Sequence, residues 1–358
     1  MVMADSSSEL SSLSYSLDNG NTWTTTTNVQ EISEKETYYL LEVTTPTVNV
    51  GDKVLLKGNV DSTAMYSFTP ININFNVSGN PFSLFYNDDF RTVTGVSDNR
   101  LRALFSRSNV VSTENLSLFS TTLTDECYAY MFRDCTSLTT PPELPATTLT
   151  AGCYTHMFYG CTSLTTAPEL PATTLAEACY QNMFYGCTSL TKAPALPATT
   201  LAYACCNGMF YDCTSLTTVS QLPATTLAEA CYSAMFINCT SLRVVPSNLL
   251  PATRTAIGCY RSMFYGCISL TTAPELPATA LVDNCYTHMF TGCSSLNYIK
   301  AMFTTTPTNS LTMEWVQGVA TTGTFIKSAE AEWTNTGTNA VPTGWTVETF
   351  DDPDEVTI

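Results

Sequence analysis

Residues 175–200 read Leu175-Ala-Glu-Ala-Cys-Tyr-Gln-Asn-Met-Phe-Tyr-Gly-Cys-Thr-Ser-Leu-Thr-Lys-Ala-Pro-Ala-Leu-Pro-Ala-Thr-Thr200, and close copies of this unit follow one another along the chain. Successive copies are 26 residues apart, with one spacing of 28, and each carries two cysteines eight residues apart. A period of this size indicates a solenoid, in which each unit forms one coil and buries its apolar face against its neighbours. The first cysteines are Cys127, Cys153, Cys179, Cys205, Cys231, Cys259 and Cys285, and the second are Cys135, Cys161, Cys187, Cys213, Cys239, Cys267 and Cys293.

The first half of the unit predicts a short helix. Leu175, Cys179 and Met183 are four residues apart, which places them on one apolar stripe. Thr174 can cap the start of the helix, and Gly186 suits a left-handed residue at its end. The other units have Gly, Asp or Asn in place of Gly186, and these residue types tolerate positive φ.

The second half of the unit predicts a short strand and a turn. Leu190 and Ala193 can face the core, with β-favouring threonines beside them. Pro194 has no N–H to donate to a sheet, so the strand should end there, and Leu196-Pro197 then turns the chain. Each coil is therefore expected to contain a strand, a turn and a short helix.

The limits of the repeats predict the domain organisation. Seven full units with degenerate copies at both ends place the solenoid at residues 99–303. The last copy lacks the proline turn, so a C-terminal cap is expected at 304–350 and a solvated acidic tail at 351–358. The tryptophans lie outside the repeats, which favours a small separate core at each end of the chain. They are Trp23, Trp315, Trp333 and Trp345.

The region before the solenoid reads as β-strands. After an N-terminal tail at residues 1–11, residues 12–98 show no 26-residue period and are expected to form a small all-β, sandwich-like domain. A hairpin is predicted around Asp18-Asn-Gly-Asn21, because Asn-Gly supplies a tight turn. Further strands are expected within residues 38–43, 53–57 and 71–77.

Composition limits the possible partners. The chain of 358 residues has 31 acidic and 14 basic residues and a formal charge of −17, which argues against a nucleic-acid partner. No stretch approaches the roughly 18 apolar residues that a membrane helix needs, so no membrane insertion is expected. The first residues lack the basic and apolar regions of a secretion signal.

The fifteen cysteines invite a chemical interpretation, and three alternatives can be compared. A spacing of eight residues does not fit a zinc knuckle, and the chain has only two histidines. Equivalent cysteines in adjacent coils would lie close enough for a disulfide, but a ladder of identical positions has no unique pairing. We therefore expect both cysteines to be small buried residues in core columns. Cys206 replaces a tyrosine found in the other six units.

Neither the histidines nor the glutamates form a catalytic pattern. His156 and His288 share the position three residues after the first cysteine, where the residue type varies, so they are expected to face solvent several coils apart. Glu143, Glu169 and Glu275 share a position beside a proline and are expected to form a solvated rim rather than a glycosidase pair. The aspartates of the tail lack the rest of a calcium loop. The sequence predicts no catalytic residue, no metal site and no cofactor.

Two segments carry a resemblance to a known family. Met157-Phe-Tyr-Gly-Cys-Thr-Ser-Leu164 and Met183-Phe-Tyr-Gly-Cys-Thr-Ser-Leu190, each followed by a proline turn, resemble the BspA-like leucine-rich-repeat family of surface proteins from gut and oral anaerobes. The resemblance covers about residues 104–303 and implies an α/β solenoid, a right-handed leucine-rich-repeat coil of short parallel strands and short helices. The extra Leu-Pro-Ala-Thr-Thr stretch and the missing export signal depart from the family pattern.

The resemblance implies a function in adhesion. Family members are linked to binding host proteins, extracellular-matrix proteins or other cells, and similar cysteine-paired proteins are carried by bacteriophages of gut bacteria. We therefore expect a non-enzymatic protein, displayed on a cell surface or a virion, that recognises a protein or glycan receptor. The expected ligand-binding residues vary between units while the repeat frame is kept: Thr155, His156, Gln181, Asn182, Asn207, Ser233, Arg261, Thr287 and His288.

Two other functions remain open from the sequence. The chain could be a structural spacer that docks into a larger assembly, or form a homo-oligomer, through its N-terminal β domain. An enzyme with a site in one of the flanking regions is the third alternative, but those regions have no histidine and no Ser/His/Asp or Cys/His arrangement.

Overall fold

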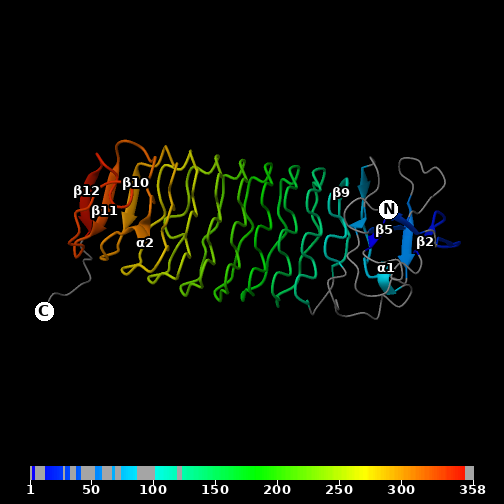
Figure 1. Ribbon diagram of the computed structural model, residues 1–358. Helices are drawn as coiled ribbons and strands as arrows, with labels where there is room; N and C mark the ends of the chain where they lie inside the picture. Colours follow the sequence, from blue (N-terminus) through cyan, green and yellow to red (C-terminus); the bar gives the residue numbers. More distant parts are fainter. Residues whose placement is uncertain are drawn as a thin grey trace.

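The protein is an elongated stack of coils. In the computed structural model the coils lie side by side along one axis, with the N-terminal strands at one end and β12 (Thr346–Phe350) at the other (Figure 1). The predicted tail at 351–358 lies outside the described part of the chain. The structure describes residues 2–4, 13–26, 29–32, 38–41, 53–58, 67–68, 74–86, 101–118 and 123–350.

Two antiparallel sheets form in the N-terminal region. One has the strand order β4-β5-β1-β7 and the other β3-β2-β6. β1 lies inside the segment expected to be a tail, and it is ordered because its backbone pairs with both β5 and β7. The strands are β1 (Val2–Ala4), β2 (Leu13–Ser16), β3 (Thr24–Thr26), β4 (Val29–Ile32), β5 (Tyr38–Leu41), β6 (Leu55–Gly58) and β7 (Ser67–Phe68).

The predicted hairpin is present. β2 and β3 pair in antiparallel fashion, and the loop between them contains Asn19 and Gly20 with φ of 59° and 89°. Such left-handed values suit Asn and Gly. The carboxylate of Asp18 holds the loop by accepting hydrogen bonds from the hydroxyl of Ser16 at 2.7 Å and the N–H of Thr22 at 2.8 Å.

The stack of coils begins earlier than the repeats predict. β8 (Phe75–Asn76) pairs in parallel with β9 (Val110–Ser112), and Ser112 bridges in parallel to Thr140 of the first cysteine-containing coil. α1 (Ser83–Tyr86) follows β8. Residues 75–79, which were expected in the separate β domain, therefore already stack on the solenoid.

Each coil contains a ribbon of turns where the sequence predicts a helix. Between residues 123 and 297 the structure contains no helix. In the coil of Cys179, the residues Ala178, Asn182 and Gly186 have φ of 49°, 51° and 70°. A left-handed residue at every fourth position is incompatible with the continuous negative φ of an α-helix. The predicted helix is therefore wrong, and we call residues 176–187 and their equivalents the turn ribbon.

Hydrogen bonds of the turn ribbon alternate between its own coil and the next one. The N–H of Asn182 donates to the carbonyl of Asn207 in the next coil at 2.9 Å. The following N–H, of Met183, donates to the carbonyl of Tyr180 at 3.2 Å within the same coil. Every second backbone donor thus joins neighbouring coils, as in a parallel strand. A helix would satisfy these donors internally and could not link the coils in this way.

The inward side chains come in pairs with a period of four residues. Cys179 and Tyr180 are buried, then Met183 and Phe184, then Cys187. The phenylalanines equivalent to Phe184 form a continuous stack from coil to coil, with ring centroids 5.5–5.7 Å apart. Stacks of this spacing are favourable offset arrangements. The core is therefore a set of columns that run the length of the solenoid.

Both cysteine columns lie in this core, as predicted. All fifteen cysteines are buried and carry free thiols. The second cysteine of each coil also donates a hydrogen bond: the Sγ of Cys187 lies 3.1 Å from the carbonyl oxygen of Phe158. The same contact measures 2.9–3.2 Å in all seven coils. Burial raises the pKa of these thiols, to about 11 for Cys135 and about 12 for Cys267.

The strand side of the coil is short. Leu190 and Ala193 are buried, as predicted. The parallel contacts between coils are isolated bridges, such as those from Lys192 to Thr166 and Thr218. Pro194 follows at once and cannot donate to a ladder, which limits the length of the strand.

The stack continues beyond residue 303. β10 (Tyr298–Ala301), β11 (Thr324–Ser328) and β12 pair in parallel, and α2 (Asn309–Thr312) lies between β10 and β11 in sequence. Trp315 is fully buried with its ring 6.0 Å from that of Tyr286, and Trp333 stacks on Phe303 at 5.2 Å. Residues 304–350 therefore extend the same core and do not form a separate one.

Candidate binding surface

The outward side of the turn ribbon forms one continuous face. In the coil of Cys179, residues 177–178, 181–182 and 185–186 lie between the inward pairs and are exposed or half-buried. Because coils stack in register, equivalent residues form columns along the solenoid. We call this surface the turn face and define it by the positions two residues before and two, three and six residues after the first cysteine.

The predicted binding residues gather on the turn face. They fall in two adjacent columns, two and three residues after the first cysteine, so the structure brings all nine to one side of the solenoid. Their exposure differs. Arg261 is exposed, whereas Thr155, Ser233 and Thr287 are buried. The half-buried ones are His156, Gln181, Asn182, Asn207 and His288.

Two of the three buried residues bond to the next coil, whereas the hydroxyl of Thr287 lies 3.3 Å from the side-chain oxygen of Asn284 in its own coil. The hydroxyl of Thr155 donates to the carbonyl of Ala178 at 2.6 Å, and that of Ser233 donates to the carbonyl of Arg261 at 3.3 Å. Each of these bonds reaches the next coil. Hydroxyls engaged in this way are not free to hold a ligand, so the accessible part of the predicted site is smaller than the sequence indicates.

The position three residues after the first cysteine does not face solvent freely, which corrects the expectation for both histidines. It is left-handed in every coil, with φ of 55° at His156, 51° at Asn182 and 55° at His288. The ring of His156 stacks on that of Tyr130 in the preceding coil, with centroids 4.8 Å apart. The side chain here packs against its equivalent in the next coil, and each residue type must fit that contact.

His156 is held as a neutral packing residue. Burial, with the charge of Arg133, lowers the pKa of His156 to about 4. Its Nε2 lies 3.1 Å from the Nδ2 of Asn182, and its Nδ1 is buried without a hydrogen-bond partner. These contacts join three successive coils.

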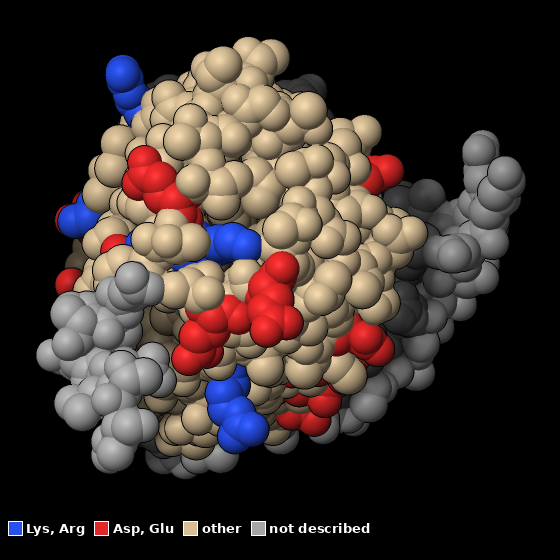
Figure 2. Space-filling model, turned by 90° about the vertical axis from the view of Figure 1, so that its left-hand side faces the viewer, with Lys and Arg blue, Asp and Glu red and all other residues tan. Residues whose placement is uncertain are grey.

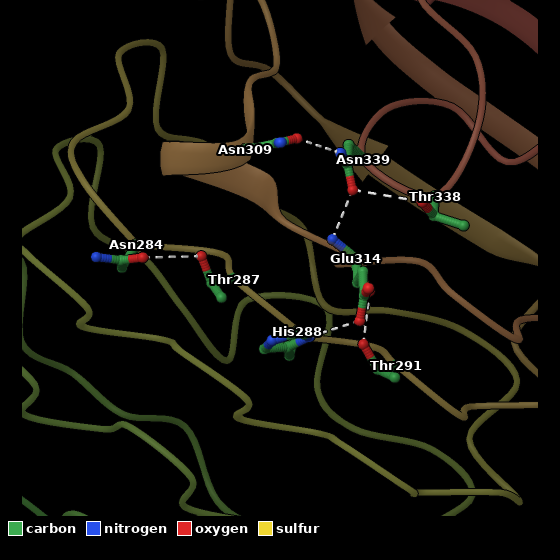
Figure 3. Close-up of polar contacts among 8 residues, drawn as sticks. All are labelled: Asn284, Thr287, His288, Thr291, Asn309, Glu314, Thr338 and Asn339. Carbon is green, nitrogen blue, oxygen red and sulfur yellow. Dashed lines mark hydrogen bonds and ion pairs between the residues drawn. The ribbon is translucent and has the colours of Figure 1, made fainter.

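His288 lies in a network of polar contacts near the C-terminal end (Figure 3). Its Nδ1 is 3.5 Å from a carboxylate oxygen of Glu314, whose backbone carbonyl accepts the hydroxyl of Thr291 at 2.5 Å. The N–H of Glu314 donates to Asn339 at 2.6 Å, and Asn339 in turn donates to Asn309 at 2.6 Å. This network connects the last cysteine-containing coil with the coils after it. It gives His288 a structural environment far from His156.

A row of tyrosines on the turn face was not among the predicted residues. Tyr159, Tyr185 and Tyr211 occupy the position six residues after the first cysteine, and their rings stack with centroids 4.6 and 4.5 Å apart. The guanidinium of Arg133 lies over the ring of Tyr159 at 5.2 Å. Burial and the nearby Asp212 carboxylate raise the pKa of Tyr185 to about 12. Their constant offset from the cysteine is visible in the sequence.

A comparison with protein families decides the identity of the repeats. A family model described as a BspA type leucine-rich repeat region, with six copies, matches residues 125–249 and 207–314. These two ranges together cover more than half of the 358-residue chain. The chain belongs to the BspA-type leucine-rich-repeat family. No significant match was found among curated proteins or among solved structures.

The BspA-type region coincides with the turn ribbon coils. It begins at Asp125, just before the first repeat cysteine, and ends at Glu314, in the polar network around His288. All nine predicted binding residues lie inside it. The coils built on β11 and β12 lie beyond it, although they continue the same parallel stack.

The surface of this BspA-type chain is mostly uncharged. Seen from its C-terminal end, the molecule shows a few separate groups of acidic side chains and fewer basic ones (Figure 2). Glu143, Glu169 and Glu275 are exposed, as expected for a solvated rim, and Glu275 is 3.4 Å from the ammonium group of Lys300. Charged side chains thus occupy only a few points of this end of the molecule.

The described residues contain no group of three or more His, Cys, Asp or Glu side chains placed to hold a metal ion. Within the same part of the chain, no helix is long and apolar enough to cross a membrane.

Proposed function

We propose that this protein is a non-enzymatic binding protein that recognises a protein or glycan receptor through the turn face of its solenoid. It acts at a surface, either that of a bacterial cell or that of a virion. Membership of the BspA-type family supports a role in surface binding. The finer assignment, to an adhesin or to a phage component, is part of the proposal.

One observation carries this proposal. The inward positions of the turn ribbon keep the same residue types in successive coils, while the outward ones change. Met183 and Phe184 have Met and Phe as equivalents in all seven coils, whereas the place of Gln181 is taken by Asn207 and Arg261 in other coils. A stack that needed only a spacer would gain nothing from a different set of polar and aromatic groups in each coil. Repeat proteins commonly bind through such extended faces.

The test compares variants of two sides of the same coils. Gln181, Asn207 and Arg261 are replaced together by alanine, which the same column has at Ala129. The control replaces exposed Thr166, Thr218 and Thr272 on the strand side by alanine. Binding of the labelled proteins is measured on arrays of glycans and extracellular proteins and on intact bacterial cells.

The turn-face variant should lose at least ~10-fold in affinity for any partner found, because a few central residues carry most of an interface's binding energy. Both variants should keep the melting temperature of the parent. If only the strand-side variant loses binding, the site lies on the other side of the coil. Binding to none of the targets would refute the proposed function. Antibody labelling of intact cells and purified virions from the natural source tests the proposed location.

A further inference from the structure

Charge is distributed very unevenly along the solenoid. The stretch of residues 230–274 contains no Asp or Glu, although the chain has 31 acidic residues. The same stretch contains Arg243, Arg254 and Arg261, so it carries +3 while the rest of the chain carries −20 for a total of −17. This stretch is therefore a local basic region of an acidic protein and can attract anions.

The three arginines of this stretch are exposed, and their guanidinium groups form no ion pair with a described residue. The hydrogen bonds at Arg243 and Arg261 involve only their backbone atoms. Arg133, nearer the N-terminus, is different: its Nε lies 3.4 Å from the carboxylate of Asp134. The arginines of residues 230–274 are therefore available to an external anion.

The coil of Arg261 carries three exposed apolar side chains. Ile257 is 50% exposed, Tyr265 42% and Ile268 48%. Ile257 and Tyr265 flank Arg261 at four residues on either side, and all three are outward positions of one turn ribbon. We call Ile257, Arg261, Tyr265 and Ile268 the arginine patch.

The fold does not require these apolar residues. The position of Ile257 is occupied by Glu177 and Glu229 in other coils, and that of Ile268 by threonine in the five preceding ones. Exposed large apolar residues are also concentrated here. Between residues 123 and 297 they are Tyr203, Val244, Ile257, Tyr265, Ile268 and Val282, and all but the first lie within residues 244–282. A local group of exposed apolar residues indicates an interaction site.

We propose that the arginine patch binds an acidic protein segment that presents carboxylates among apolar or aromatic side chains. The proposal rests on the proposed function and names the chemistry of the partner. A free guanidinium pairs with a carboxylate through two parallel hydrogen bonds, and isoleucine and tyrosine beside it can exclude water from that pair. Aliphatic side chains offer little to the hydroxyl groups of a glycan, which is why the patch favours a polypeptide.

The experiment uses defined polymers as probes, so it does not depend on finding the natural partner. Binding of the full chain is measured to a random copolymer of glutamate and tyrosine, to heparin and to a copolymer of lysine and tyrosine. The test variant combines Ile257→Ala, Arg261→Gln and Ile268→Thr, because these residues occupy the same positions in other coils and the variant then loses one positive charge, as the control does. Its melting temperature should stay close to that of the parent. The control is Arg254→Ala, which has Ala280 as its equivalent in the next coil.

The parent should bind the glutamate–tyrosine copolymer, more weakly as salt is raised. Any binding of the lysine copolymer, which the net charge of −17 favours, should not fall in the triple variant. The triple variant should lose at least ~10-fold in affinity and Arg254→Ala less than about threefold. Equal losses in the two variants would mean attraction by charge alone and would overturn the proposal. Tighter binding of heparin would also overturn the proposal, because the patch would then bind an anionic glycan. Binding of neither the glutamate–tyrosine copolymer nor heparin would overturn it as well. The polymer assay is independent of the cell-binding assay. Polymer binding can be absent while the turn face still binds cells, and cell binding can be absent while the polymer is bound.

Discussion

At the scale of the residue, the second cysteine of each coil has two functions. It fills a small space in a core column, and its thiol donates to a phenylalanine carbonyl of the preceding coil. The carbonyl of Phe158, for example, accepts both the N–H of Cys161 and the thiol of Cys187, each at 3.1 Å. Alanine would fill the column but leave the carbonyl with one partner. A buried thiol combines small size, low polarity and a weak donor.

The buried thiols predict a sharp loss of stability at alkaline pH. In the folded chain the pKa of every thiol except that of Cys205 is raised, mainly by burial, to about 12 for Cys153 and Cys231, whereas unfolded cysteine ionises near 8.5. Below that pH both states hold the proton and the full stability is present. As the pH rises from about 8.5 toward 12, each thiol with a raised pKa favours the unfolded state by about 1.4 kcal/mol per pH unit.

Because many thiols act together, unfolding should be cooperative somewhat above pH 9. Circular dichroism and thiolate absorbance near 240 nm, recorded during the same titration, should change together. Thiolate appearing near pH 8.5 while the dichroism stays native would show that the cysteines are not in the core. A reversible return on lowering the pH, under reducing conditions, controls for oxidation.

At the scale of the element, the spacing of left-handed residues determines the local structure. A helix repeats every 3.6 residues, whereas the inward pairs of the turn ribbon repeat every four. Each turn closes on a residue of positive φ, such as Asn182 or Gly186, and the next inward pair follows. The period of four was present in the sequence and was misread as a helical stripe, since three apolar residues at that spacing fit both periods.

Neighbouring coils approach closely at Gly323, just before β11. A side-chain carbon there would lie 2.8 Å from the ring of Trp345 and closer still to the carbonyl oxygen of Asn297. Gly323→Ala should therefore destabilise the protein by about 1–3 kcal/mol, because the backbone cannot yield without separating β10 from β11. Urea unfolding measures the loss. Thr322→Ala, at the exposed neighbouring residue, should change stability by less than about 0.5 kcal/mol. Equal stability of the two variants would contradict the close packing of these coils.

At the scale of the whole molecule, the solenoid is one continuous core. Each coil contacts mainly its neighbours, so an end must be covered by atypical coils. Trp315 and Trp333 cover the last regular coil, against Tyr286 and Phe303 respectively. The C-terminal coils are thus part of the stack and protect it at the same time.

Removal of the coils after Phe303 distinguishes a continuous stack from a stack closed by an independently folded cap. A chain ending at Phe303 loses β11, the partner of β10, and exposes the apolar surface under Trp315. We expect it to bind the dye ANS and to aggregate on a sizing column, whereas a chain ending at Phe350 should stay monodisperse and keep the parent melting temperature. A shortened chain that folds as well as the parent would support the separate cap.

Much of the candidate surface could be predicted, because variable positions at a fixed offset must form columns in any stacked repeat. Gln181, Asn182, Asn207 and Arg261 were located in this way. Burial of Thr155, Ser233 and Thr287 could not be predicted, because it depends on how closely the next coil approaches. The tyrosine row has a constant offset in the sequence, but its stacking follows only from the structure. The arginine patch appears only when exposure is known for each coil.

The sequence by itself determined that the protein is a solenoid, where its regular coils lie and which side chains form its core. Those features follow from the repeat, which requires equal residues to stack on equal residues. Only the tertiary structure decided that the coils are built from turns and that the stack runs from Phe75 to Phe350. The physical reason is that hydrogen bonds between coils, rather than those within them, select the backbone conformation. Coils without the repeat pattern can still supply such bonds.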